Sequence, residues 1–195
     1  MKVSDEEQAL AALAHRVLPA GNFGNIASDV VIRRGAGGRV WDVSGNEYVD
    51  FLLGSGPMLL GHAHPEVNAA VIDQLARGST FFANNEHGIA LAEAICEAVP
   101  CAEKVRYTSS GSEATHYAMR VARAARGRDK IMKFEGGFHG MNDYALMSVA
   151  PSRPGNFPQA APESAGIPQV LVGEMLIAPF NDAAAATALI EEHRN

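Results

Sequence analysis

The residues best placed to do chemistry lie where an apolar run meets a helical pattern, in the segment KVRYTSSGSEATHYAMRVARAAR at 104–126. Ligands of open α/β sheets bind at the carboxyl ends of the strands, where a following helix offers unpaired N–H groups and the positive end of its dipole. Gly111 allows close approach to the backbone, and Ser110 and Ser112 add hydroxyl donors. The junction is therefore suited to an anion, most naturally a phosphate.

The serines at this junction also have a simpler interpretation, because serine is a favoured N-cap residue. The spacing alone leaves the N-cap and the phosphate site as alternatives. The chain contains no G-x-x-x-x-G-K-[ST] P-loop and no G-x-S-x-G nucleophile elbow. An α/β hydrolase that uses Ser109 or Ser110 is therefore a weak alternative, and no histidine or acid is clearly placed to activate the hydroxyl.

A second candidate segment, KFEGGFHG at 133–140, also follows a predicted strand. Phe138 and His139 are therefore expected at the same edge of the sheet as the serines. An aromatic face beside a phosphate site suits a planar, phosphorylated ring. The alternative is a turn aromatic that packs on the core, followed by a histidine that forms only a local hydrogen bond.

Metal binding has little support in the sequence. His62 and His64 lie in the turn GHAHP, but two histidines are too few for a metal site. Cys96 and Cys101 do not have a metal-ligand spacing, and a reduced, cytosolic setting explains them most simply. We therefore expect no metal ion.

Composition and charge favour a globular chain whose partners do not include nucleic acid. The 195 residues are 47% hydrophobic and carry a formal net charge of −6. No apolar run approaches the ~20 residues of a membrane span, and the acidic start lacks the apolar region of a signal peptide. These features predict a soluble, cytoplasmic protein without a membrane partner. Positive charge is scattered along the chain except for one group of arginines. These are expected to complement the negative end of a helix dipole: Arg120, Arg123, Arg126 and Arg128.

The elements that must position these residues change in character along the chain. The first part is predicted to contain a helix at 5–18 ended by Pro19, a loop at 21–29, a hairpin at 39–53 around Ser44-Gly45-Asn46, and helices at 65–77 and 86–99. The second part is predicted to contain strands at 104–109, 129–134, 144–150 and 175–178, with helices at 112–126 and 182–193. Strands that alternate with helices imply a parallel, doubly wound sheet.

A long segment at 151–174 interrupts this alternation and holds five of the ten prolines. Loops of this length are usually lids, binding loops or disordered segments. The sequence leaves two alternatives open: a functional lid, or a plain surface excursion.

Taken together, these stretches resemble a class III aminotransferase of the pyridoxal phosphate fold type I, with the greatest likeness to glutamate semialdehyde aminomutase. The likeness runs in the family's order from about residue 20 to the end. It is carried by VWDVSGNEYVDF (40–51), GPMLLGHAHPEV (56–67), VRYTSSGSEATHYAMRVARAARGRDKIMKFEGGFHG (105–140) and APFND (178–182).

This resemblance implies an α/β, fold type I aminotransferase-like chain with two parts. Residues 1–64 would form an N-terminal segment with a hairpin that makes small-domain and dimer contacts. Residues 65–195 would form the first part of the large, doubly wound cofactor-binding domain, with a gate-like loop at 151–174. The family uses the turn GHAHP structurally, near the subunit interface.

The resemblance also implies the roles of individual residues. Ser110, Gly111 and Ser112 match the S-G-T segment that grips the phosphate of pyridoxal 5′-phosphate. Phe138 matches the aromatic residue that stacks on the pyridine ring, and His139 follows it as in the family. The aminomutase usually has a tryptophan just before G-P-M, at a position toward the substrate, and here that position is Ser55.

The family's Schiff-base lysine and the acidic residue at the ring nitrogen lie on later strands than those present here. The chain has four lysines, and none matches that position: Lys2, Lys104, Lys130 and Lys133. Lys133 matches a family lysine that does not form the Schiff base. We therefore assign no catalytic residue to these 195 residues.

Two functional hypotheses follow from the resemblance. In the first, the chain is part of a homodimeric aminotransferase or aminomutase that moves an amino group on a small amino acid or semialdehyde. In the second, it is a catalytically incomplete cofactor-binding or interaction module that pairs with a complementary chain. The amino donor and acceptor do not follow from the sequence.

Overall fold

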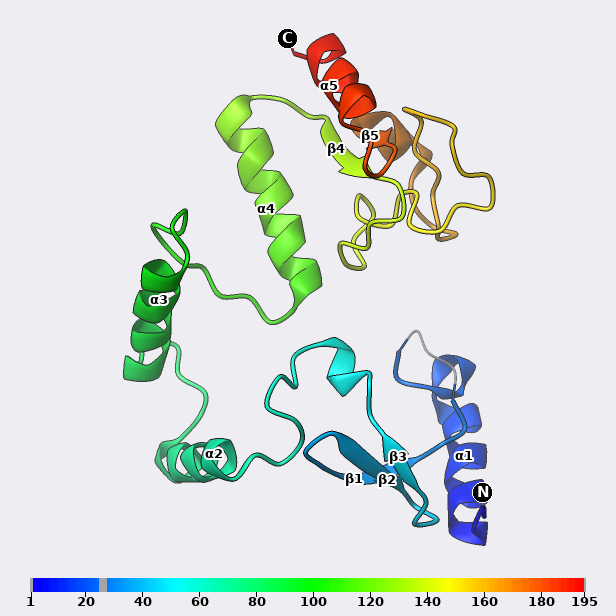
Figure 1. Cartoon of the computed structure of the whole chain (residues 1–195), viewed down its shortest axis with the longest axis vertical. Helices are drawn as coiled ribbons and strands as arrows, with labels where there is room; N and C mark the ends of the chain where they lie inside the picture. Colours follow the sequence, from blue (N-terminus) through cyan, green and yellow to red (C-terminus); the bar gives the residue numbers. More distant parts are fainter. Residues whose placement is uncertain (1, 25–27, 195) are drawn as a thin grey trace. The chain divides into compact units, whose positions relative to one another are not determined.

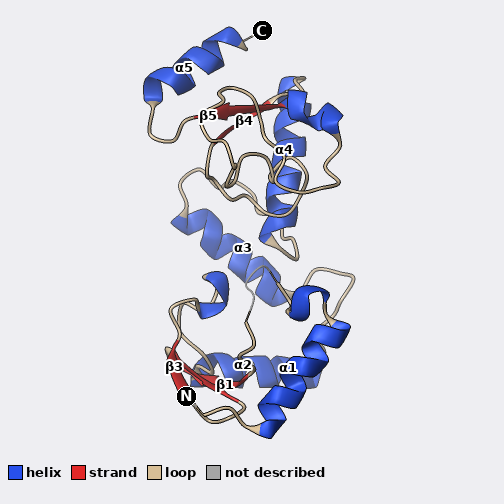
Figure 2. Ribbon diagram, turned by 90° about the vertical axis from the view of Figure 1, so that its right-hand side faces the viewer, coloured by secondary structure: helices blue, strands red, loops and turns tan. Residues whose placement is uncertain are grey.

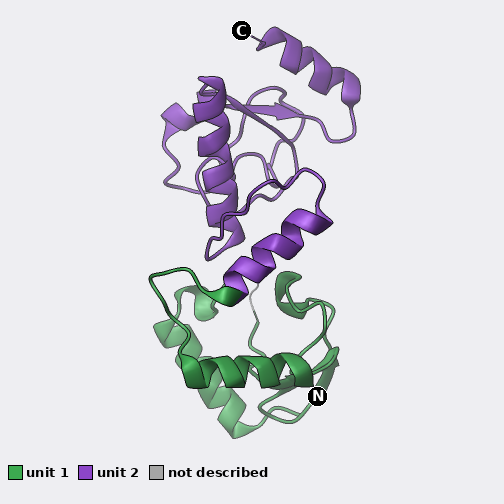
Figure 3. Cartoon of the chain, turned by 90° about the vertical axis from the view of Figure 1, so that its left-hand side faces the viewer, with its two compact units in different colours: residues 1–86 green, residues 87–195 purple. Residues whose placement is uncertain are grey.

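The computed structural model describes residues 2–24 and 28–194. The chain forms two compact units, residues 1–86 and 87–195 (Figure 3). The division expected at 64/65 concerns the domains of the whole protein and stays a prediction. None of the helices in the described ranges is long and apolar enough to cross a membrane.

The first unit combines a helix with a small antiparallel sheet (Figure 1). Helix α1 (Asp5–Val17) starts at the N-cap Ser4 and ends before Pro19, as expected. Strands β2 (Arg39–Asp42) and β3 (Glu47–Val49) form the expected hairpin. Strand β1 (Ile32–Ala36) adds a third strand beside β2 that the sequence pattern did not predict, because IRRGA lacks apolar alternation. The loop expected at 21–29 includes residues 25–27, which lie outside the described part of the chain.

A buried carboxylate explains why the chain turns at 44–46. Asp42 is buried and accepts hydrogen bonds of 2.7 Å from the Asn46 N–H, the Asn46 side-chain amide and the Tyr48 hydroxyl. Burial alone would raise the pKa of Asp42, but these hydrogen bonds outweigh burial and hold that pKa below 3.8. Buried Glu7 joins α1 to the residue that precedes β1, because its carboxylate accepts from the Val31 N–H at 3.0 Å.

His62 links the turn GHAHP to other residues of the first unit by hydrogen bonds. The Nε2 atom of His62 lies 2.7 Å from Oδ2 of Asp50, and Oδ1 of Asp50 accepts from the N–H groups of Leu52 and Leu53 at 2.9 and 3.0 Å. The backbone of His62 also exchanges two hydrogen bonds with Gly37. Among the described residues, no group of three or more His, Cys, Asp or Glu side chains could hold a metal ion.

Replacing Asp50 with asparagine is expected to destabilise the protein at neutral pH, because hydrogen bonds to a charged group are replaced by weaker ones. The His62 hydrogen bond and the N–H of Leu53 hold the pKa of Asp50 below 3.8. A carboxylate with a lowered pKa stabilises the fold above its unfolded pKa, and this contribution is lost as pH falls through the folded pKa. The difference between wild type and D50N in urea unfolding should therefore shrink in acid.

A suitable control for D50N is Asp73→Asn, which breaks an exposed pair between Asp73 and Arg77 at 2.8 Å. Exposed helical pairs contribute only about 0.3–0.5 kcal/mol. A D50N effect no larger than that of D73N, or one that stays constant with pH, would contradict the assigned role of Asp50.

Two further helices agree with the sequence prediction. Helix α2 (Pro65–Arg77) has Pro65 as its first residue and ends at Gly78, whose φ of 99° suits glycine. Helix α3 (Glu86–Ala98) ends shortly before Pro100.

The second unit contains a parallel pair of strands with helices beside it in the chain (Figure 2). Strand β4 (Ile131–Phe134) pairs with β5 (Met175–Ala178) in parallel register, from Ile131 opposite Met175 to Phe134 opposite Ala178. Helix α4 (Gly111–Arg126) precedes β4, and helix α5 (Ala183–Glu192) follows β5. A parallel pair is the arrangement expected for a doubly wound sheet.

Two predicted strands are wrong. Residues 104–109 belong to no strand, because no neighbouring strand in the described residues pairs with them. Residues 144–150 form no strand either: the φ of 51° at Ser148 breaks the extended backbone, and only an isolated bridge joins Met147 to Pro162. The apolar residues of this second segment fill the core instead, where Ala145 and Met147 are buried.

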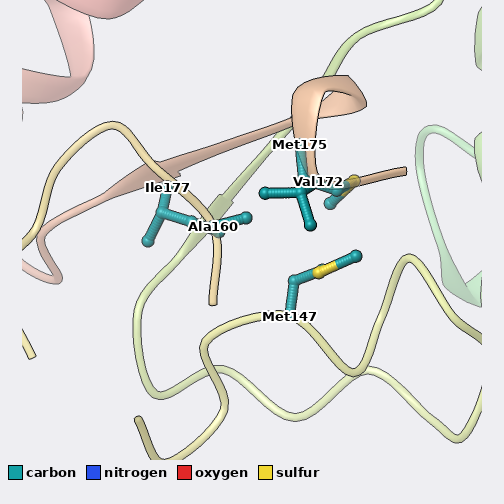
Figure 4. Packing of buried hydrophobic residues seen from close by; sticks show 5 residues of the cluster. All are labelled: Met147, Ala160, Val172, Met175 and Ile177. Carbon is teal, nitrogen blue, oxygen red and sulfur yellow. The ribbon is translucent and has the colours of Figure 1, made fainter. Parts of the chain in front are cut away.

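The core of the second unit forms between that segment, β5 and the proline-rich loop. Its buried cluster is Met147, Ala160, Val172, Met175 and Ile177 (Figure 4). The loop at 151–174 thus contributes Ala160 and, from the 3₁₀ helix η3 (Gln169–Glu174), Val172. A hollow of about 730 Å³ is lined by Glu135, Ser148 and residues 150–156 and 159–163, so that Ala160 forms part of its wall. The loop is therefore anchored at its middle and its end.

Candidate functional site

The N-terminus of α4 is capped by the serine that the sequence identified. Ser110 is the N-cap, and its Oγ accepts from the N–H of Glu113 at 3.2 Å. The Glu113 carboxylate in turn accepts from the N–H of Ser109 at 2.7 Å. This reciprocal pair resembles a capping box. The N-cap interpretation of Ser110 is therefore confirmed by the geometry.

The cap leaves room for an anion at the same helix end. Across residues 2–24 and 28–194, no acceptor is found for the N–H groups of Gly111 and Ser112. A Cβ atom built on Gly111 would meet nothing within 4 Å, so the backbone there is open to approach. The positive end of the dipole of α4 adds a favourable field for negative charge. The first turn of α4 thus fits a phosphate group.

The far end of α4 explains the arginines. Gly127, with a φ of 61°, ends the helix, and its N–H donates to the Arg123 carbonyl at 2.8 Å. Arg123 and Arg126 lie in the last turn, near the negative end of the dipole. The Arg123 guanidinium also lies 4.0 Å from the ring centroid of Tyr144. These contacts agree with the interpretation of the arginines as complements of the helix dipole.

The turn after β4 packs directly against the first turn of α4. The hydroxyl of Ser112 accepts from the N–H of Met141 at 3.0 Å. The hydroxyl of Thr115 donates to the carbonyl of His139 at 2.6 Å. A Cβ built on buried Gly140 would lie 2.6 Å from Cα of Ser112, so only glycine fits between the two segments. The structure thus brings the predicted segments 110–112 and 138–139 together.

The side chain of Phe138 is 59% exposed, so a ring face is available to a planar ligand. It is not an aromatic residue packed on the core, which was the alternative from the sequence. His139 is also exposed, and a Cβ at Gly137 would lie 2.8 Å from its Nε2 atom. An exposed aromatic side chain in a turn that contacts the open end of α4 suits a phosphorylated aromatic ring.

Two residues of this arrangement were missed from the sequence. Gly140 ends the turn GGFHG and allows the close contact, and Thr115 lies one helical turn after Ser112. The i, i+3 spacing of Ser112 and Thr115 puts both hydroxyls on one face of α4. That spacing was the available signal, but it did not indicate which segment would meet the face.

Lys133 lies on β4, the strand that precedes the aromatic turn, but its side chain points into the core of the second unit. Its side chain is buried, and its Nζ donates to the carbonyls of Ala145 and Met147 at 3.1 and 2.5 Å. Burial lowers the pKa of Lys133, and the negative charge of Glu163 opposes this shift only in part. The amine is therefore engaged by the backbone of residues 145–147.

Ser55 belongs to the first unit. It ends the 3₁₀ helix η2 (Leu53–Ser55), has a φ of 65°, and its N–H donates to the Leu52 carbonyl at 2.9 Å. Because Ser55 lies in the other compact unit, its role toward a substrate stays a prediction.

Comparison with known proteins gives consistent matches. A family model described as aminotransferase class-III matches residues 22–195. A glutamate-1-semialdehyde 2,1-aminomutase from Methanothermobacter thermautotrophicus is 50% identical over 157 residues, which are 80% of this chain and 36% of that protein. An omega-transaminase structure from Sphaerobacter thermophilus has a TM-score of 0.90 at 40% identity and covers 96% of this chain and 44% of that one.

A further solved structure, described as a transaminase with PLP bound, has a TM-score of 0.90 at 34% identity, over 99% of this chain and 46% of that chain. PLP is pyridoxal 5′-phosphate. These scores confirm the α/β, aminotransferase-like fold expected from the sequence. The chain spans less than half the length of each of these three proteins.

Proposed function

This chain belongs to the class-III aminotransferase family, and we propose that it is part of a pyridoxal-phosphate-dependent aminotransferase or aminomutase that moves an amino group on a small amino acid or semialdehyde. The observation that carries the proposal is the pairing of an open, N–H-rich helix end with an exposed aromatic turn. These two features suit the two chemically different ends of pyridoxal phosphate.

The chain's own residues would bind and orient that cofactor. The N–H groups of Gly111 and Ser112 would donate to phosphate oxygens, since they lack acceptors in the described residues. The Ser110 and Ser112 hydroxyls accept within the protein and still have a proton to donate. Phe138 would cover one face of the ring, with His139 beside it. When bound, pyridoxal phosphate supplies an electron sink for negative charge on the substrate carbon.

None of the four lysines is assigned as the residue that would bind the cofactor covalently. Lys133 supports this assignment because both of its hydrogen bonds go to core carbonyls. The lysine and the acidic partner of the ring nitrogen are assigned to parts of the enzyme outside these 195 residues. This agrees with a chain that spans 36% of the length of the aminomutase relative.

The same proposal covers the surroundings of the site. Ser55 would face the substrate, and its small side chain in place of tryptophan would change the shape of that side of the site. The loop at 151–174 would gate the site, and residues 1–64 would contribute to a homodimer. The free cysteines Cys96 and Cys101 suit the reducing cytoplasm.

Binding of pyridoxal phosphate to the full-length protein, followed by its visible absorbance, tests the proposal. We expect Gly111→Ala to weaken binding by about 10–100-fold, because the added methyl stands in the approach to the backbone and charge-assisted hydrogen bonds contribute about 1.5–3 kcal/mol. The fold should be unaffected, since the space around that Cβ is empty.

A matched control is Gly173→Ala, which also adds a methyl where nothing lies within 4 Å but lies in η3. G173A should bind pyridoxal phosphate as wild type does. A wild-type protein that does not bind pyridoxal phosphate, or equal affinities in G111A and G173A, would overturn the assignment of the site.

The alternative is an incomplete module that pairs with a complementary chain. Large apolar side chains at the surface favour association of some kind: in the second unit, Val121 is 66% and Phe180 79% exposed. The intact mass of the native protein separates the two hypotheses. A species of roughly twice the 20.6 kDa of this chain supports one continuous enzyme, whereas a species of 20.6 kDa alone supports the module.

A further inference from the structure

We propose that Thr115 is a positioning residue that holds the aromatic turn, residues 137–141, against the anion-binding end of α4. The inference rests on the proposed function, since the turn carries the ring face and α4 the phosphate donors. Thr115 itself would touch neither part of the cofactor. It would act through His139, by fixing where the backbone of the turn lies.

The hydrogen bond of Thr115 crosses between segments that are far apart in the chain. Its Oγ1 lies 2.6 Å from the carbonyl oxygen of His139, 24 residues away. The carbonyls of Gly111 and Ser112 in its own helix are farther, at 3.1 Å each. A hydroxyl has one proton to donate, and the shortest contact indicates that Thr115 donates it to the backbone carbonyl of His139.

This geometry differs from that of an ordinary helical threonine. Threonine inside a helix usually donates back to the carbonyl four residues earlier. Thr187 on α5 does so, with its hydroxyl 2.7 Å from the carbonyl of Ala183. Thr115 also has a carbonyl four residues earlier within reach, that of Gly111 at 3.1 Å. Its closest acceptor, however, is the carbonyl of His139 in another segment. The hydroxyl therefore joins two segments instead of closing a local turn.

The turn depends on hydrogen bonds to α4 because its glycines give its backbone a wide choice of conformations. Gly136 and Gly140, with φ of 80° and 99°, bracket Phe138 and His139. The contact of Thr115 fixes the turn on one side of Gly140, and the Met141–Ser112 hydrogen bond fixes it on the other. Without the Thr115 hydroxyl, His139 loses its hydrogen bond to α4, and the backbone next to Phe138 is held less firmly against the first turn of the helix.

A positioning role predicts different effects on two ligands. Inorganic phosphate uses only the helix end, whereas pyridoxal phosphate uses the helix end and the ring face together. We expect Thr115→Val in the full-length protein to bind pyridoxal phosphate about 10-fold more weakly, which corresponds to one misplaced contact of ordinary strength. Its affinity for inorganic phosphate, measured by phosphorus NMR, should stay within about 2-fold of wild type.

Hydrogen exchange gives a readout that needs no cofactor. The amide of Met141 should exchange faster in T115V than in wild type, because the turn opens more often. Thr115→Ser keeps the hydroxyl and should restore both the slow exchange and the affinity for pyridoxal phosphate. Thr187→Val is the matched control: it removes a back-bond within a helix, and both quantities should stay at wild-type values.

Three results would overturn the inference. They are equal affinity and exchange in T115V and wild type, no rescue by T115S, and loss of phosphate and pyridoxal phosphate binding together, which would indicate a structural role. Failure of the proposed function looks different, because wild type itself would then not bind pyridoxal phosphate. The exchange of Met141 would still test Thr115 in that case.

Discussion

Replacing Gly140 with alanine is expected to weaken pyridoxal phosphate binding by about 100-fold or more and to destabilise the protein by about 2–4 kcal/mol. The added Cβ would lie 2.6 Å from Cα and 3.0 Å from Cβ of Ser112. Because the nearest atom is backbone, the overlap cannot be relieved by rotating a side chain. The aromatic turn and the first turn of α4 would have to move apart, and the ring face would separate from the phosphate donors.

Backbone strain at Gly140 contributes to the expected loss of stability together with the overlap. Gly140 has a φ of 99°, a conformation that side-chain-bearing residues rarely adopt. Such strain contributes about 1–3 kcal/mol. The overlap with Ser112 adds to it, as overpacking does in a well-packed core.

The matched control for G140A is Gly136→Ala in the same turn. Gly136 has a φ of 80°, but nothing lies within 4 Å of its Cβ. G136A should therefore show the strain in the free energy of unfolding and little change in pyridoxal phosphate affinity. If G140A and G136A behaved alike in both measurements, the contact between Gly140 and Ser112 would have no part in forming the site.

Replacing Lys133 with methionine is expected to destabilise the protein by about 2–4 kcal/mol at pH 7, because the carbonyls of Ala145 and Met147 lose a donor inside the core. Methionine keeps the length and apolar character of the side chain, so the loss is mainly one of hydrogen bonds. Removing a buried charge offsets part of this effect.

The pH dependence gives a second, independent test of Lys133. Burial lowers its pKa below the ordinary 10.5, so the folded protein releases this proton at a lower pH than the unfolded chain does. Wherever the unfolded state binds more protons, stability rises with pH. The unfavourable term from burying the charge is therefore complete below the folded pKa and disappears as pH rises toward 10.5. Wild type should gain stability relative to K133M over that interval.

Urea unfolding of wild type, K133M and Lys130→Met between pH 7 and 10 measures both effects. Lys130 is exposed and lies just before β4, and K130M should unfold much as wild type does at every pH. A K133M variant as stable as K130M, or a difference from wild type that does not grow with pH, would contradict the buried role of Lys133.

Much of the candidate site could be predicted from the sequence because its parts are local. Each of these features depends on residues within about one helical turn of it. They are the N-cap at Ser110, the open backbone at Gly111 and the helix end at Gly127. Helix ends respond mainly to side chains within a few residues, so their signals survive in the linear pattern. The helices at 65–77 and 86–99 were predicted for the same reason.

Predictions that required a neighbour were less successful. Residues 144–150 have the apolar residues of a strand, but Met147 faces the buried cluster from an irregular segment. A strand exists only where a second chain segment supplies its hydrogen bonds, and periodicity does not report that segment.

The sequence by itself determined the class of fold, the helix boundaries and the types of residue at the helix end and in the aromatic turn. Only the tertiary structure decided that Thr115 donates to His139, that Gly140 lies against Ser112 and that Lys133 serves the core. The physical reason is range: capping and amphipathic patterns act within a few residues, whereas these three contacts join residues 12 to 28 positions apart, so their geometry appears only when the segments pack together.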